Sequence, residues 1–203
     1  MLGLILCMNV DRSRYYKASY VEQVSMDDFA CAKAPGRGYR YLPADSEHVL
    51  LPAFHGLSYT TFKVTAPDAP QTIKIASPGH PGTAVELAVT VENAGEKYAG
   101  AETVLVFFKP ENRTNPGGAE LLPLQRRLCG FKKVLLAPHA STVVKISIDA
   151  IDLAMADEAG TLTQIPGKYT IILSTGAVGG DEIEVPLTVS GERTVVERLP
   201  AGI

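Results

Sequence analysis

The chain contains no tryptophan, and it has only three cysteines and four histidines among its 203 residues. The cysteines, Cys7, Cys31 and Cys129, are widely scattered and odd in number, which indicates neither a disulfide framework nor a zinc site. No two histidines have the spacing of metal ligands, and no glycine-rich loop leads into a helical pattern as a phosphate site requires. We therefore expect reduced, structural thiols, no bound metal and no cofactor.

The sequence also has no large excess of positive or negative charge. The net charge is −3, and basic residues cluster no further than the pairs Arg126-Arg127 and Lys132-Lys133. Such a surface attracts nucleic acid poorly, so we do not expect nucleic acid as a partner. Long apolar runs are missing too: the N-terminal stretch "MLGLILCMNV" holds about eight apolar residues in a row, which fits neither a signal peptide nor a membrane span. No membrane partner is expected.

What the sequence does contain is a series of β-strand patterns. In residues 84–93, "AVELAVTVEN", apolar and polar side chains alternate, which predicts a strand with one buried face. Residues 104–108 are apolar without interruption, which predicts a strand covered on both faces. The predicted strands are 59–64, 84–93, 102–108, 129–136, 142–149, 165–173 and 182–189. About seven strands without a sequence repeat predict an all-β sandwich, either immunoglobulin-like or fibronectin type III.

Further patterns concern the organisation of the chain. Residues 149–160 have room for a helix of only one or two turns. Pro186 has no N–H to donate to a neighbouring strand, so its strand is expected at a sheet edge. Residues 1–55 lack a sustained period and predict an extended N-terminal arm. The sandwich is then expected at 56–192, followed by a C-terminal tail at 193–203.

A histidine and a serine in residues 53–62, "AFHGLSYTTF", raise the question of nucleophilic catalysis. The run that starts at Gly56 comes within one residue of the G-x-S-x-G elbow, whose serine lies between a strand and a helix. Here Thr60 replaces the second glycine, and strand-forming residues follow instead of a helix. A hydrolase that uses Ser58 with His55 as its base is therefore only an alternative, and adjacent carboxylates elsewhere indicate solvated turns. We assign no catalytic residue.

These motifs together resemble the C-terminal fibronectin type III-like domain of glycoside hydrolase family 3, the β-glucosidases and β-xylosidases. The segments that carry the resemblance are "FHGLSYTTF", "VTVENAG", "AGAETVLVFF", "LCGFKKVLLAPH" and "IPGKYTIIL", in the family's order and spacing. Upstream, "YYKASYVEQVSMDDF" and "PGRGYRYL" are similar to the end of the family's second domain and the linker out of it. Two departures stand out: the family's Phe-Gly-Tyr is here Ala53, Phe54 and His55, and Gly38 replaces a threonine.

The resemblance implies a chain that performs no catalysis itself. The family's nucleophile is an aspartate on an N-terminal barrel and its acid/base group lies on a second domain, and no residue of this chain matches either position. The expected function is that of a non-catalytic accessory domain that supports those catalytic domains, in the same polypeptide or as a separate chain. Exposed apolar surface on the arm would favour self-association. The alternative is a free-standing carbohydrate- or protein-binding module in which Tyr39, Tyr41 and Tyr98 contact sugar.

The motif residues then take structural roles. Gly56 permits a backbone turn, and Tyr59 and Phe62 are expected to anchor the arm to the sandwich. Gly130 predicts a close approach of two chain segments, and Phe131 predicts a core aromatic side chain. Because burial of a phenylalanine contributes roughly 1.5–3 kcal/mol, these aromatic residues are expected to matter more to stability than any loop charge. The full set is Gly56, Leu57, Ser58, Tyr59, Phe62, Gly130 and Phe131.

Overall fold

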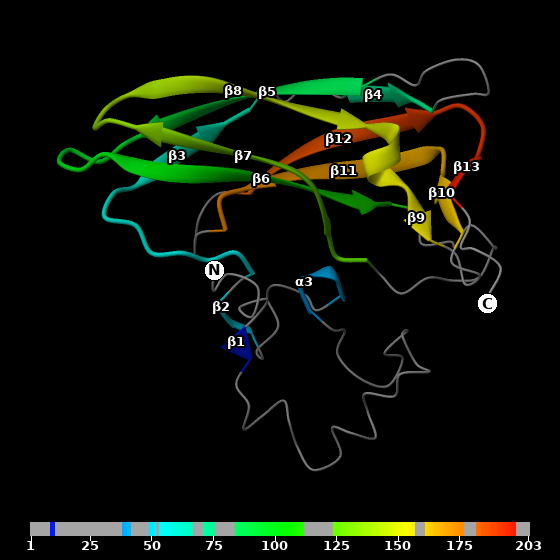
Figure 1. Cartoon of the computed structure of the whole chain (residues 1–203), viewed down its shortest axis with the longest axis horizontal. Helices are drawn as coiled ribbons and strands as arrows, with labels where there is room; N and C mark the ends of the chain where they lie inside the picture. Colours follow the sequence, from blue (N-terminus) through cyan, green and yellow to red (C-terminus); the bar gives the residue numbers. More distant parts are fainter. Residues whose placement is uncertain are drawn as a thin grey trace, which may run out of the picture.

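The computed structural model describes residues 9–10, 38–41, 49–51, 53–66, 71–75, 84–111, 124–156, 161–176 and 182–197. Its body is a sandwich of two sheets, with strand orders β3-β5-β8 and β4-β12-β11-β6-β7 (Figure 1). The first sheet contains β3 (Phe62–Thr65), β5 (Ala84–Asn93) and β8 (Ser141–Asp149). The second contains β4 (Gln71–Lys74), β12 (Ile183–Ser190), β11 (Gly167–Ser174), β6 (Gly100–Pro110) and β7 (Arg127–Leu136). The predicted all-β sandwich is confirmed.

Shorter elements flank these two sheets. A small sheet consists of β13 (Thr194–Glu197), β10 (Leu162–Gln164) and β9 (Met155–Ala156), and β13 falls in the segment predicted as a tail. The stretch predicted to hold a short helix contains one 3-10 turn, η1 (Ala150–Leu153), directly before β9. In the predicted arm, α3 (Gly38–Tyr41) is one helical turn, and β1 (Asn9–Val10) pairs with β2 (Val49–Leu51).

The main core lies between the two sheets. Strands β5, β8 and β12 alternate buried and exposed side chains, as their period-two patterns predicted. Strand β6 differs because residues 104–108 are all buried. Val104, Val106 and Phe108 enter the main core, whereas Leu105 and Phe107 belong to a second cluster. The prediction of a strand covered on both faces is confirmed, and the second cover lies on the outer face of the five-stranded sheet, the face that points away from β3-β5-β8.

The prediction that Pro186 marks an edge strand is wrong. Strand β12 lies inside its sheet, between β4 and β11. Pro186 pairs with Thr170 of β11, while the parallel partner β4 begins opposite Leu187 and follows the strand only to Ser190. The proline thus lies just outside the stretch that β4 pairs with, where a missing N–H disturbs no ladder on that side. The error arose because β4 is four residues long and shows no strand pattern of its own.

The expectation of a core position for Phe131 is also wrong, since its side chain is 65% exposed. The register between β6 and β7 shifts next to Phe107, so that Cys129 is an extra residue between the partners Leu128 and Gly130. This bulge places Phe131 opposite Leu105, on the outer face. The predicted close approach at Gly130 is present: a Cβ there would lie 3.2 Å from Cγ2 of Ile146.

The bulge residue Cys129 has a strongly shifted pKa. Burial, with a smaller contribution from Asp152, raises the pKa of its thiol from 9.0 to about 12, while Arg127 opposes the shift. The folded state therefore keeps a proton that the unfolded chain loses above about pH 9, so this contribution to stability is full below that pH and is lost as the pH rises toward 12.

We expect the free energy of unfolding to fall by up to about 1.4 kcal/mol per pH unit above pH 9, and to fall less steeply in Cys129→Ala. Urea unfolding at several pH values measures both slopes. In a Cys7→Ser, Cys31→Ser background, Cys129 should react with a thiol reagent at pH 8 only after unfolding. Equal slopes, or rapid labelling of the folded chain, would contradict this picture.

Candidate functional site

A second hydrophobic cluster covers the outer face of the five-stranded sheet. Leu105, Phe107 and Ile172 are 6%, 2% and 6% exposed although they point away from the main core. Tyr39 of α3 and Leu128 of β7 pack against them. The outer face of an isolated sandwich is normally exposed to solvent, so the burial of these three side chains shows that residues outside the two sheets, among them Tyr39, cover it.

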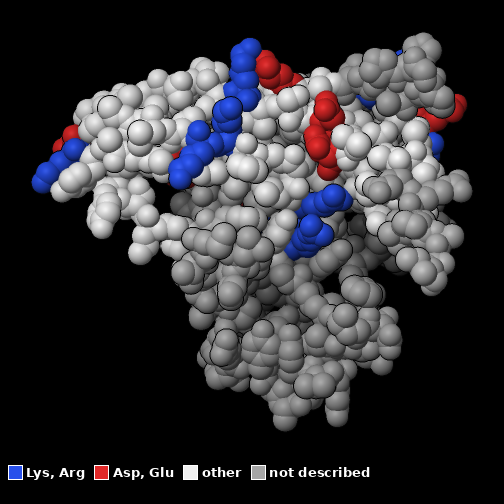
Figure 2. Space-filling model, viewed as in Figure 1, with Lys and Arg blue, Asp and Glu red and all other residues white. Residues whose placement is uncertain are grey.

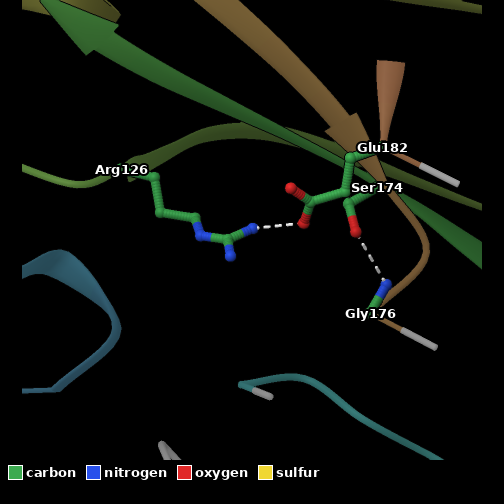
Figure 3. Close-up of polar contacts among 4 residues, drawn as sticks. All are labelled: Arg126, Ser174, Gly176 and Glu182. Carbon is green, nitrogen blue, oxygen red and sulfur yellow. Dashed lines mark hydrogen bonds and ion pairs between the residues drawn. The ribbon is translucent and has the colours of Figure 1, made fainter. Parts of the chain in front are cut away.

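Three aromatic rings form the contact between arm and sheet, and we call them the outer aromatic cluster: Tyr39, Phe54 and Phe107. The ring centroids of Tyr39 and Phe54 are 5.2 Å apart, and those two rings lie 5.9 and 5.7 Å from Phe107. These separations are typical of favourable edge-on or tilted aromatic pairs. The Arg126 guanidinium lies 5.4 Å from the centroid of Phe107 and pairs with Glu182 (Figure 3). One cation–π contact and one ion pair therefore border the apolar contact.

Two hydrogen bonds donated by backbone N–H groups also hold α3 against the sheet. The Gln125 N–H donates to the Arg40 carbonyl over 2.6 Å, and the Leu128 N–H lies 3.5 Å from the Tyr39 hydroxyl oxygen, which accepts. Both donors lie at the start of β7 or just before it, and both acceptors lie on α3. The single turn of α3 is too short to be stable alone, so these bonds and the aromatic contacts hold it in place.

Phe54 reaches the cluster from an unusual backbone conformation. Its φ is +70°, in the left-handed region that favours glycine, and the family motif has glycine at this position. Below it, Gly176 also has a positive φ, +73°, and a Cβ there would lie 2.8 Å from the Phe54 carbonyl oxygen. The Gly176 N–H donates to Ser174 Oγ over 3.1 Å, which fixes this turn after β11 (Figure 3). Phe54 thus has a backbone conformation that favours glycine, and its ring, 41% exposed, packs against Tyr39 and Phe107 on the outer face.

The lead-in segment, residues 56–61, is tied to the sandwich by Asn93, which is fully buried. The Thr60 hydroxyl and the Gly95 N–H both donate to Asn93 Oδ1, over 2.5 and 3.1 Å. Asn93 Nδ2 in turn donates to the carbonyls of Tyr98 and Leu136, over 3.0 and 3.1 Å. This node satisfies both the donors and the acceptor of the amide. Two of its partners, Thr60 and Leu136, lie 33 and 43 positions away along the chain, so the sequence pattern does not reveal this node.

Two glycines make room for Thr60. A Cβ on Gly95 would lie 1.9 Å from Thr60 Oγ1, and a Cβ on Gly100 would lie 2.6 Å from Thr60 Cγ2. Both distances are shorter than any real contact of a Cβ atom. The Thr60 side chain therefore occupies a slot between Gly95 and Gly100 that only glycines leave open. The local fit explains why glycines stand at these two places in "NAGEKYAG".

We expect Gly95→Ala to lower the free energy of unfolding by about 1–3 kcal/mol, because the added methyl group displaces Thr60 from Asn93. The variant Thr60→Ala alone should cost about 1 kcal/mol, since it removes one hydrogen bond. If the clash with Thr60 causes the loss in Gly95→Ala, the double variant of Gly95→Ala and Thr60→Ala should lose less stability than the sum of the two single losses. Chemical denaturation measures all three. Additive losses would mean that Gly95 is needed for another reason.

The predicted motif residues take different places from those expected. Leu57 and Tyr59 are 97% and 93% exposed, so Tyr59 does not anchor the arm to the sandwich. Phe54 and Tyr39 do so instead. Phe62 is the first residue of β3, is half-buried and packs against the main core. Gly56 is exposed and has open space around it.

Ser58 and His55 do not form a catalytic pair in the structure. Ser58 Oγ accepts a bond from the Thr60 N–H over 3.3 Å, which is the local backbone contact expected of a structural serine. His55 Nδ1 is buried and has no hydrogen-bond partner. A base without a link to its nucleophile cannot activate it.

The three tyrosines proposed for sugar contact do not form one surface. The ring of Tyr39 is engaged in the outer aromatic cluster, and the side chain of Tyr41 lies outside the described residues. Tyr98 is 49% exposed; its ring lies 6.2 Å from that of Tyr59 at an interplanar angle of 56°, with Lys97 Nζ 5.3 Å from its centroid. Two exposed tyrosines are therefore adjacent but tilted.

Other kinds of site find little support in the described part of the chain. No group of three or more histidine, cysteine, aspartate or glutamate side chains there could hold a metal ion. None of its helices is long and apolar enough to cross a membrane. Figure 2 shows that most of the described surface on this face is uncharged, with a short row of basic side chains and a few acidic ones.

Comparison with known proteins places this architecture. Residues 102–177 match the family model described as fibronectin type III-like domain. The chain is 30% identical over 202 residues to a probable exo-1,4-beta-xylosidase, bxlB, of Aspergillus fumigatus, and the match covers 91% of this chain and 24% of the relative. It is 34% identical over 141 residues to a probable beta-glucosidase H of Aspergillus oryzae, covering 69% and 16%. The chain thus spans a quarter or less of the length of these relatives.

Solved structures agree. A GH3 exo-beta-xylosidase, XlnD, in complex with a xylobiose aziridine probe matches 92% of this chain and 25% of its own, with a TM-score of 0.67 and 22% identity. A beta-glucosidase from Kluyveromyces marxianus in complex with glucose matches 73% of this chain and 16% of its own, with a TM-score of 0.53 and 27% identity. In each case the matched part is a minor share of a much longer enzyme.

Proposed function

Because this chain contains the C-terminal fibronectin type III-like domain of glycoside hydrolase family 3, we propose that it is a non-catalytic accessory domain of a β-glucosidase or β-xylosidase of that family. In this role the sandwich stabilises the arrangement of the catalytic domains. The catalytic carboxylates are then supplied by those domains, in the same polypeptide or in a separate chain.

The docked arm is the observation that carries this proposal. The arm resembles the end of the family's second domain, and its rings of Tyr39 and Phe54 close the outer face over Phe107. A strand buried on both faces in a two-sheet sandwich requires something outside the sandwich to cover it. The outer face of the five-stranded sheet thus carries residues of the segment that resembles the end of the second domain and its linker, which supports a structural role for the sandwich.

The purified chain should show no turnover of aryl β-glucosides or aryl β-xylosides, and no labelling by a fluorophosphonate probe. A full-length family 3 β-glucosidase serves as the positive control for turnover, and a known serine hydrolase serves as the positive control for labelling. Hydrolysis by the chain that a single carboxylate substitution abolishes would contradict the proposal. Labelling that Ser58→Ala abolishes would instead favour the serine hydrolase alternative.

A carbohydrate-binding module is the second candidate, and the exposure of Tyr59 and Tyr98 is the observation that favours it. Two aromatic rings form a platform for sugars best when they are exposed and coplanar, whereas the ring planes of Tyr59 and Tyr98 are inclined at 56° to each other. Titration calorimetry with xylan and glucan oligosaccharides at millimolar concentration distinguishes the two functions. Saturable heat that Tyr98→Ala abolishes would establish the module, and flat titrations favour the accessory domain.

A further inference from the structure

We propose that Leu57, Tyr59 and Tyr98, which we call the tyrosine patch, are buried against the catalytic part of a family 3 glycosidase. This inference rests on the proposed function and assigns a second contact surface to it, separate from the outer aromatic cluster. The partner surface would be apolar where it meets Leu57 and Tyr59, and would offer a carboxylate to Lys97.

The first argument is exposure. Leu57 and Tyr59 are 97% and 93% exposed, and Tyr98 is 49% exposed. A single exposed apolar side chain is ordinary, but Leu57 and Tyr59 are only two positions apart, and the Tyr59 ring lies 6.2 Å from the Tyr98 ring, so we treat the three as a patch. Tyrosine is among the residues most enriched at the centres of protein interfaces.

The second argument is that the backbone next to the patch is held by contacts on both sides. Before the patch, the ring of Phe54 contacts the rings of Tyr39 and Phe107, although it is 41% exposed. On the other side, Thr60 donates to the buried amide of Asn93, and the same amide bonds the carbonyl of Tyr98. Both tyrosines are therefore attached to one node. A surface ordered before binding loses little conformational entropy when a partner covers it, which favours docking.

The third argument identifies the occupant. The patch begins three residues after Phe54, so it continues an interface that the arm already makes with the sandwich. The related xylosidase is about four times as long as the matched stretch, so its remaining part is available as a cover. Lys97, stacked 5.3 Å from the Tyr98 centroid, adds an exposed cation beside the apolar area. An apolar patch with one cation at its rim fits a protein surface better than a sugar, for which the tilted rings give no flat platform.

The test uses a hybrid enzyme in which this full chain replaces the matched segment of the Aspergillus fumigatus xylosidase. The readouts are the hydrolysis of 4-nitrophenyl β-xyloside and its half-life at a temperature that slowly inactivates the hybrid. We expect Leu57→Ser combined with Tyr59→Ser to shorten that half-life about tenfold or more, because the interface opens more readily. The control Val143→Ser, at a residue 57% exposed on β8 in the other sheet, should leave it unchanged.

Each outcome decides one of the two proposals. In the free chain, both variants should unfold at the same denaturant concentration as the wild type, since their side chains are exposed there. A stable wild-type hybrid whose half-life the double variant does not change would overturn the tyrosine patch and leave the accessory function standing. If the wild-type hybrid is inactive while the xylosidase with its own segment is active, the accessory function fails. If the double variant abolishes sugar binding by the free chain, the patch is a carbohydrate site.

Discussion

The variant Asn93→Asp is expected to lose about 3–5 kcal/mol of folding free energy at pH 8. The substitution keeps the size of the side chain and the acceptor for Thr60, but it replaces an amide that donates to the carbonyls of Tyr98 and Leu136. In that fully buried position, the carboxylate oxygen that replaces Nδ2 would face the two carbonyl oxygens, and no donor would lie between them. An uncompensated buried charge typically costs about this much.

The pH dependence provides an internal check on the Asn93 prediction. Burial should raise the pKa of the new carboxyl group above its unfolded value, so the folded state binds the proton more tightly. Stability is then recovered as the pH falls and is lost as it rises, which urea unfolding between pH 4 and pH 8 measures. The control is Glu92→Gln at the exposed neighbour, which should change stability by no more than about 0.5 kcal/mol. A loss below about 1 kcal/mol at pH 8 would mean that the node does not hold the lead-in segment.

The variant Phe107→Ala should lose about 3–5 kcal/mol, although Phe107 lies outside the main core. Its side chain is 2% exposed and contacts the rings of Tyr39 and Phe54 and the guanidinium of Arg126. Without that ring the arm loses its central contact on the sheet. Thermal and urea unfolding measure the loss, and trypsin should cleave the variant after the exposed Arg40 faster than it cleaves the wild type.

Phe131→Ala is the matched control for Phe107. Both phenylalanines lie on the outer face of the same sheet, in neighbouring strands, but Phe131 is 65% exposed. Its removal should change stability by no more than about 0.5 kcal/mol. Similar losses for the two variants would mean that the arm does not cover Phe107 in solution.

The sequence was most informative where structure follows from local pattern. Alternation in residues 84–93 predicted β5 with the observed bounds, and the unbroken apolar run at 104–108 predicted burial on both faces. Strand β4 was missed because four residues cannot show a period, and its parallel pairing with β12 is non-local. Phe131 was predicted on the wrong face because one extra residue, Cys129, moves the side chains that follow it to the opposite face of the sheet.

The candidate site was less predictable for the same physical reason. Strand β3 begins at Phe62, the last residue of the motif at 53–62, but the motif did not reveal which side chains contact the outer face of the sheet. Asn93 donates a hydrogen bond to the carbonyl of Leu136, 43 positions later. The ring of Phe54 packs against that of Phe107, which is also distant in the sequence. Long-range contacts of this kind leave no spacing in the sequence, so only the folded arrangement identifies them.

The bulge at Cys129 also bears on solubility. Strand β7 is the last strand of the five-stranded sheet in the part of the chain that the structure describes, and an edge strand is where a second molecule can add by strand pairing. A bulge typically bends its strand, and the exposed Lys132 and Lys133 lie three and four positions after Cys129. Two adjacent charges on an irregular edge oppose the stacking of like strands between molecules. We therefore expect the feature that turned Phe131 outward also to disfavour strand pairing between molecules at this edge.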